Sequence, residues 1–140
     1  MKIKKNNYSI QVFGKIIFIK TFHAWDARIN HQFKDELHQL VEDIFSDQNW
    51  VMISDVRGWG LNTPDAEESS EEMLRQTEIN FPTHVAFVVG GSDIKKWQLE
   101  KMLKNNQHFK MHIVDKMDEA IDWIEQNGFQ VDELKRHLSD

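Results

Sequence analysis

The chain of 140 residues contains no cysteine, which excludes disulfides, thiol catalysis and cysteine-ligated zinc or iron–sulfur sites. It has only two prolines, and its longest apolar runs are too short to cross a bilayer. Residues 1–7 carry charge but no apolar segment of the kind found in signal peptides, so we expect a cytoplasmic protein. The share of apolar residues, 40%, is ordinary for a soluble globular protein, and the length predicts one domain over residues 1–140.

The net charge of −6 argues against a nucleic-acid partner, because phosphate contacts need a basic surface. The charge is unevenly distributed: residues 1–25 hold five lysines and no acid, whereas residues 65–78 hold six acids and one arginine. We interpret the lysines as protection of a sheet edge and the acids as the start of a helix. A peripheral membrane contact ranks below partner binding, because no apolar anchor accompanies the lysines.

Hydrophobic periodicity predicts an α/β fold: a single mixed sheet of about five strands with an N-terminal hairpin, and four to five helices packed on it. Continuous apolar runs separated by helices favour parallel pairing of the central strands. Gly14-Lys15 is typical of a tight hairpin turn. The predicted order is strand 8–13, strand 15–22, helix 25–47, strand 50–56, a helix from Pro64, strand 85–89, helix 93–103, strand 109–113, a helix capped by Asp115 and a short terminal helix.

The second helix has a thin apolar stripe and is expected to pack weakly. Thr63 is its predicted N-cap and Pro64 its first residue. The residues of its inner face are Ala66, Ser70, Met73, Leu74 and Thr77. This helix is therefore the element that we expect to open most easily.

Three stretches resemble the STAS family, in particular its SpoIIAA-like domains, which have also been compared with the lipid-binding SEC14 fold. They are the strand 50–58, the strand 85–89 and the helix 118–124. The resemblance implies a SpoIIAA-like fold over most of the chain. In anti-sigma-factor antagonists of the family a serine after the first of these strands is phosphorylated, but the matching position here is Pro64, which has no hydroxyl. We therefore expect no phosphorylation site.

Gly58-Trp59-Gly60 forms part of a dinucleotide-binding fingerprint, but Thr63 replaces the third glycine. We interpret this stretch as a bend that places Trp59 at the rim of a binding surface. His31, Asp35 and His38 share one face of the first helix, but that face is predicted to be solvated. We therefore predict no metal site and no cofactor.

The tryptophans indicate where a partner would bind. Trp50, Trp97 and Trp123 fall on predicted core-facing or half-buried positions, whereas Trp25 and Trp59 fall at junctions between elements. The weakly apolar second helix adjoins the second of these junctions. The predicted binding surface comprises Arg57, Trp59, Leu61, Met73, Leu74, Ser92 and Trp97.

The leading hypothesis is a non-catalytic binding module that holds a protein partner or a small apolar, lipid-like ligand near the second and third helices; a homodimer is also considered. The alternative is a small hydrolase- or lyase-type enzyme acting on an anionic substrate at the carboxyl ends of the central strands. Its candidate polar cluster is Asp55, Arg57, Ser92 and Asp93. Asp55 and Arg57 are equally well interpreted as a structural ion pair.

Overall fold

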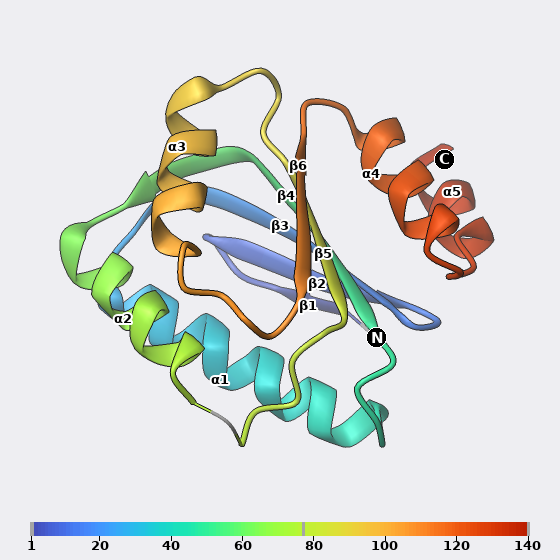
Figure 1. Cartoon of the computed structure of the whole chain (residues 1–140), viewed down its shortest axis with the longest axis horizontal. Coiled ribbons are helices and arrows are strands. Elements are labelled where there is room, and N and C mark those ends of the chain that lie inside the picture. Colours follow the sequence, from blue (N-terminus) through green and yellow to red (C-terminus); the bar gives the residue numbers. More distant parts are fainter. Residues whose placement is uncertain (1, 77, 140) are drawn as a thin grey trace.

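The computed structural model describes residues 2–76 and 78–139, and it contains one sheet with helices on both faces (Figure 1). Thr77, predicted to lie on the inner face of the second helix, is outside the described residues. The elements are β1 (Lys2–Lys4), β2 (Tyr8–Phe13), β3 (Ile16–Trp25), α1 (Ala27–Ile44), β4 (Val51–Asn62), α2 (Pro64–Leu74), β5 (His84–Val88), α3 (Asp93–Met102), β6 (Lys110–Val114), α4 (Met117–Gln126) and α5 (Asp132–Ser139).

The strands lie side by side in chain order, from β1 to β6. β1, β2 and β3 are antiparallel, and β3, β4, β5 and β6 are parallel, so the predicted mixed sheet with an N-terminal hairpin is confirmed. Gly14 and Lys15 form the two-residue turn of that hairpin, where Gly14 has a φ of 61°. β1, which was not predicted, adds a short outer strand that pairs with residues 9–11.

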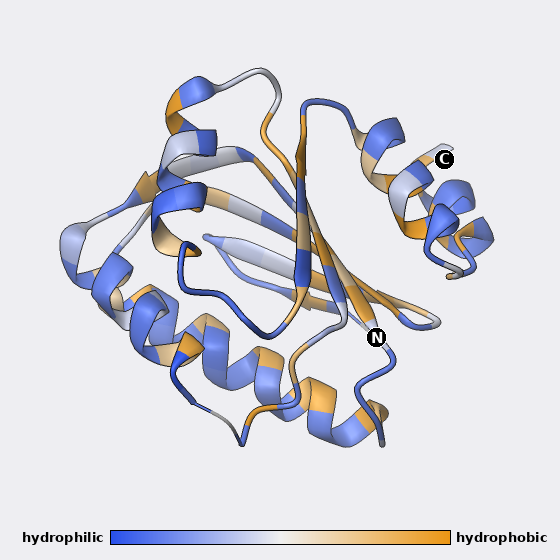
Figure 2. Ribbon diagram, in the orientation of Figure 1, coloured by the Kyte–Doolittle hydropathy of each residue, from blue (hydrophilic) through white to orange (hydrophobic). Residues whose placement is uncertain are grey.

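Each face of the sheet has its own apolar core. α1, α2 and α3 cover one face, and α4 and α5 cover the other (Figure 1). Successive residues of a strand point to opposite faces, so Ile17 and Ile19 enter the first core while Ile16 and Phe18 enter the second. Residues 16–19 of β3, 51–53 of β4 and 85–88 of β5 are buried or half-buried, and all of them are apolar because both faces of the sheet are covered here (Figure 2).

Two predicted helix starts are wrong. α1 begins at Ala27 instead of Trp25, because Asp26 is the N-cap and its carboxylate accepts a hydrogen bond from the Ile29 amide at 2.9 Å. Trp25 instead ends β3. Asp115 does not cap α4; its carboxylate accepts a hydrogen bond from the Gly91 amide at 2.9 Å and so joins the β5–α3 loop to the end of β6.

β4 continues six residues beyond the predicted end of its strand, so Gly58-Trp59-Gly60 lies within the sheet and is not a bend. β4 stays paired with β3 through two irregularities in register. At each of them β4 advances by three residues while β3 advances by two. A Cβ atom on Gly60 would lie 2.8 Å from the Ala24 nitrogen. Glycine is required at this position because the backbone of β3 approaches too closely for a side chain.

The two strands are also bent at residues with a left-handed backbone. His23 in β3 has a φ of 64° and Leu61 in β4 a φ of 75°, a region that costs a non-glycine residue about 1–2 kcal/mol. His23 is the last paired residue before the second irregularity, which lies between the pairs His23–Trp59 and Trp25–Asn62, and Leu61 lies inside it. The extended pairing of β3 with β4 must therefore be stabilised by the packing around it.

Substitution of Gly60 by alanine is expected to destabilise the protein by about 1–3 kcal/mol, because the added methyl group overlaps the backbone of β3. Gly58→Ala is the matched control and should cost less, since one of its two nearest atoms, at 3.0 Å, belongs to the side chain of Phe22. Urea denaturation of both variants measures the difference. A G60A variant as stable as wild type would contradict the close approach of the two strands.

Candidate functional site: an apolar cavity under three helices

A cavity of about 160 Å³ lies between the sheet and the three helices α1, α2 and α3. Its lining follows β4 from Trp50, just before the strand, to Asn62 at the end, so the space is elongated along the strand. Most of the lining side chains are apolar, among them Phe33, Phe87, Leu99 and Met102. The cavity therefore offers an elongated apolar surface inside the first core.

Two aromatic rings, Trp25 and Phe33, line the cavity on the side of β2, and Tyr8 of β2 packs against both of them. The ring centroids of Tyr8 and Trp25 are 5.8 Å apart, and Phe33 of α1 lies 5.2 Å from Tyr8 and 5.1 Å from Trp25. The tilted and edge-on arrangement is the one that aromatic pairs prefer. The Trp25 indole N–H donates to the Asn7 carbonyl at 3.2 Å. This wall is fixed by both packing and hydrogen bonding.

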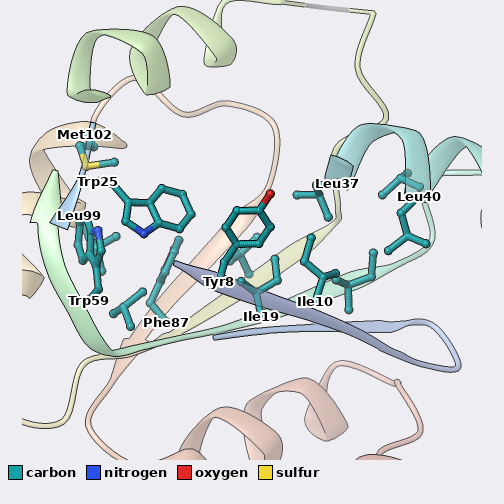
Figure 3. Packing of buried hydrophobic residues seen from close by; sticks show 14 of the residues in the cluster. Tyr8, Ile10, Ile19, Trp25, Leu37, Leu40, Trp59, Phe87, Leu99 and Met102 are labelled. Atoms are coloured by element: carbon teal, nitrogen blue, oxygen red, sulfur yellow. The ribbon is translucent and has the colours of Figure 1, made fainter. Parts of the chain in front are cut away.

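Trp59 forms the wall over the C-terminal half of β4. Its side chain is only 6% exposed and lies in the same cluster as Leu99 and Met102 of α3 (Figure 3). The prediction that Trp59 lies on a bend at the rim of a surface is wrong, because the irregular pairing keeps Trp59 within the strand and its side chain is in the core. Leu61 packs against this cluster but does not line the cavity.

α2 closes the cavity with few apolar contacts. Ala66, Ser69, Ser70 and Leu74 are its buried residues, and two of them are serines. Ser70, Met73 and Leu74 line the cavity. The prediction that this helix has a thin apolar face is confirmed for the described residues. Thr63 occupies the N-cap position as predicted, but its hydroxyl contacts the Asp65 carboxylate instead of capping an amide.

Polar side chains link α2 to its neighbours. The Asn30 amide donates to the Ser70 hydroxyl at 3.3 Å, which joins α1 to α2. The Gln98 amide donates to the Glu67 carboxylate at 2.9 Å, and Lys101 lies 3.3 Å from the same carboxylate, which joins α3 to α2. These contacts orient α2 without burying much apolar surface.

Two buried polar atoms of the lining have no hydrogen-bond partner among the described residues. They are the Thr21 hydroxyl oxygen and the Asn62 side-chain oxygen. Thr21 is only 7% exposed. An unsatisfied buried polar group costs about 1–3 kcal/mol, so two in one cavity call for an explanation.

Lys34 and His38 of α1 are half-buried residues of the lining and mark its polar border. Burial lowers the pKa of His38 below its ordinary value, and the charge of Lys34 lowers it further. The prediction that His38 lies on the solvated face is wrong. Within residues 2–76 and 78–139, no three His, Asp or Glu side chains are grouped to hold a metal ion.

Asp55 and Arg57 form a bidentate ion pair outside the cavity. The guanidinium donates to the two carboxylate oxygens at 2.9 and 2.8 Å, and the Arg57 amide donates to the same carboxylate at 3.1 Å. This hydrogen bonding raises the pKa of Arg57. Asp55 is buried, and its oxygens are occupied by these donors. The geometry matches the structural interpretation of the pair.

The other candidate residues of the polar cluster lie at the start of α3. The Ser92 hydroxyl caps the helix by accepting from the Lys95 amide at 3.3 Å, and Asp93 is exposed. Neither residue lines the cavity, nor do Asp55 and Arg57. Trp97 is 59% exposed on α3, so the prediction of a core-facing or half-buried ring is wrong. Of the seven predicted surface residues, the cavity brings together Trp59, Met73 and Leu74.

A wider hollow of about 600 Å³ lies where the parallel strands begin, between the β2–β3 turn and the α4–α5 region. Its lining mixes the charges of Lys15, Asp132, Glu133 and Arg136. His84 also lines it; burial, and then the charge of Lys110, lower the pKa of this residue. The hollow has no buried unpartnered polar atom among the described residues, unlike the apolar cavity.

Sequence reasoning missed Thr21 and Asn62. Thr21 follows Ile17 and Ile19 at a spacing of two residues, so alternation alone places it on the same face of β3. No comparable signal exists for Asn62, because its position depends on the continuation of β4 through two irregularities.

The architecture is that of a SpoIIAA-like fold. The structure is similar to that of an uncharacterized protein of the DUF3478 family with a SpoIIAA-like fold, from Shewanella loihica PV-4, with a TM-score of 0.64. That similarity covers 88% of this chain and 98% of the other at 13% sequence identity. No protein-family model matches the chain, and no curated protein matches it either. The predicted fold class is therefore confirmed, and the likeness extends to the fold alone.

The helices of the described residues include none with the length and apolar character needed to span a membrane.

Replacement of Thr21 by valine is expected to increase the free energy of unfolding by up to about 1 kcal/mol, because it removes an unsatisfied hydroxyl without changing the side-chain shape. Thr83→Val is the matched control. The Thr83 hydroxyl donates to the Trp50 carbonyl at 3.3 Å, so its loss should destabilise by about 1 kcal/mol. Chemical denaturation compares the two variants. An equal loss of stability in both would show that the Thr21 hydroxyl is already satisfied.

Stability is expected to fall as the pH is lowered from about 6.5 towards 5. An unfolded histidine takes up a proton near pH 6.5, whereas folded His38 and His84 resist protonation because their pKa values are lowered. The resulting loss of stability is absent above the unfolded pKa, and it grows as the pH falls towards the folded pKa of each histidine. Thermal unfolding of wild type, H38Q and H38Q/H84Q should show a progressively smaller loss over this range. Identical pH profiles would contradict the lowered pKa values.

Proposed function

We propose that the protein is a non-catalytic binding module that holds a small apolar ligand in the cavity under α1, α2 and α3. The observation that carries this proposal is the cavity itself. Protein cores are packed as densely as organic crystals and contain few voids larger than a water molecule. A pocket of about 160 Å³ that reaches into the core and is lined mainly by apolar side chains is therefore an exception to this rule.

The volume limits the size of the ligand. Engineered apolar cavities of roughly 150 Å³ bind molecules as large as benzene, so about seven non-hydrogen atoms are a reasonable occupant here. The elongated lining along β4 favours a chain over a compact ring. A short alkyl chain, or the end of a longer one, matches both the volume and the shape.

α2 supplies the entrance in this proposal. It covers the cavity through Ser70, Met73 and Leu74, and it is joined to α1 and α3 mainly through polar side chains. Its displacement exposes less apolar surface than displacement of α1, whose buried residues are Ile29, Leu37, Leu40 and Val41. The small apolar area makes opening at α2 less costly.

The enzyme alternative has weaker support. Its candidate residues Asp55 and Arg57 form hydrogen bonds with each other, and the Ser92 hydroxyl caps a helix. A protein partner would use a different surface, where Ile94 and Trp97 are exposed one helical turn apart on α3. Both residues lie outside the cavity lining. The cavity is the feature with a defined volume, shape and entrance, and it therefore carries the proposal.

Binding is tested with 1-chlorohexane, an uncharged chain of seven non-hydrogen atoms. Three of the five tryptophans, Trp25, Trp50 and Trp59, line the cavity, so uptake should change the intrinsic fluorescence. At tenfold excess over the dissociation constant the ligand should stabilise the protein by about 1.4 kcal/mol. No change in fluorescence or in the melting temperature, either with saturating 1-chlorohexane or with saturating 1-hexanol, would overturn the proposal.

A filled cavity provides the control for this experiment. Ser54 is a buried residue of the lining, so Ser54→Leu places additional apolar volume in the cavity and should weaken binding at least tenfold. Ser139→Leu makes the same change at an exposed position of α5 and should leave binding unchanged. Circular dichroism checks that both variants are folded.

Hydrogen exchange tests the proposed entrance. Amides of α2 are expected to exchange through openings of much lower free energy than those of α1, because α2 buries less apolar surface. Bound 1-chlorohexane should slow exchange in α2 more than in α4, which lies on the other face of the sheet. Equal protection of α1 and α2 would remove α2 as the entrance.

A further inference from the structure

The two unpartnered polar atoms of the cavity carry information about its ligand. The Thr21 hydroxyl can donate or accept one hydrogen bond, whereas the Asn62 side-chain oxygen can only accept. A single type of ligand group, a hydroxyl, satisfies either atom. An entirely apolar ligand leaves both atoms unpaired in a space without other partners.

The unpaired state of Asn62 does not depend on how its amide is oriented. Its backbone is held by Gln98, which accepts from the Asn62 amide at 3.1 Å and donates to the Asn62 carbonyl at 3.3 Å. The side-chain nitrogen has only the Met102 sulfur, at 3.4 Å. Exchange of the side-chain nitrogen and oxygen would leave the nitrogen unpaired instead, so one polar atom stays available in both orientations.

The two atoms are well separated. Asn62 pairs with Trp25, which lies four residues beyond Thr21 on β3. At about 3.3 Å per residue, the distance along the strand is on the order of 13 Å. One hydroxyl therefore reaches only one of the two atoms, and a chain lying along β4 can place its polar end at either.

The two unpartnered atoms belong to neutral side chains and offer no charge to an anionic ligand. Lys34 is the one permanently charged side chain of the lining among the described residues, and it lies at the half-buried border with His38. The neutral side chains of Thr21 and Asn62 would not compensate a carboxylate for the loss of its hydration. A neutral polar group avoids this penalty.

Building on the function proposed above, we infer that the ligand is an uncharged alkyl chain bearing a hydroxyl group, which donates a hydrogen bond to the Asn62 oxygen or to the Thr21 hydroxyl. The apolar rings around the cavity contact the chain, and the two polar atoms select the hydroxyl. Specificity for an alcohol over a hydrocarbon or a fatty acid then comes from two side chains on neighbouring strands.

The test compares 1-hexanol with 1-chlorohexane, which replaces the hydroxyl by a chlorine that donates no hydrogen bond, and with hexanoate. Affinities are measured by tryptophan fluorescence for wild type and for T21V, N62L and T21V/N62L. In the double variant the affinity for 1-hexanol should fall about tenfold, whereas that for 1-chlorohexane should stay constant or rise. Hexanoate should bind wild type at least tenfold more weakly than 1-hexanol.

T83V is the matched control, since it removes a hydroxyl that lies outside the apolar cavity. It should leave the ratio of the two affinities unchanged. If the double variant does not fold, the single variants decide, and 1-hexanol must lose affinity relative to 1-chlorohexane in at least one of them. Equal ratios in all folded variants, or tighter binding of hexanoate than of 1-hexanol, would overturn the inference. Failure of both 1-hexanol and 1-chlorohexane to bind wild type would instead overturn the proposed function.

Discussion

The parallel pairing of β3 with β4 is the constraint on which the site depends. It runs from the pair Ile16–Val51 to the pair Trp25–Asn62 and continues beyond the last pair of β4 with β5, Asp55–Val88. This extension carries Trp25 and Trp59 over the space beneath α2 and α3. Without it, β4 would end near Asp55 and the cavity would lack its aromatic wall and one of its two polar atoms.

The parts of the fold that depend on local patterns were predictable from sequence. The apolar run of β5 and the periodicity of α1 each match one element, because burial on one or two faces imposes a simple repeat. Ser92 begins α3 as an N-cap, as its place before Asp93 indicates. The resemblance to SpoIIAA-like domains added the overall topology, which local patterns alone do not determine.

The site was only partly predictable, because it depends on contacts between distant segments. Glycines around Trp59 indicate a bend when they are considered alone, yet here they permit the close approach of Ala24 in a neighbouring strand. Trp97 has a spacing compatible with the core, but α3 turns toward the sheet through Gln98, Leu99 and Met102 and leaves the indole in solvent. Met73 and Leu74 were identified correctly because a thin apolar stripe is a local property of α2.

The cavity also affects how the protein responds to hydrostatic pressure. A pocket of about 160 Å³ per molecule corresponds to on the order of 100 mL per mole, and the part of it that water leaves empty disappears when the chain unfolds. Compression therefore favours the unfolded chain when the cavity is empty. A ligand that fills the pocket removes most of this volume difference. The volume change of unfolding, and with it the sensitivity to pressure, therefore depends on whether the ligand is bound.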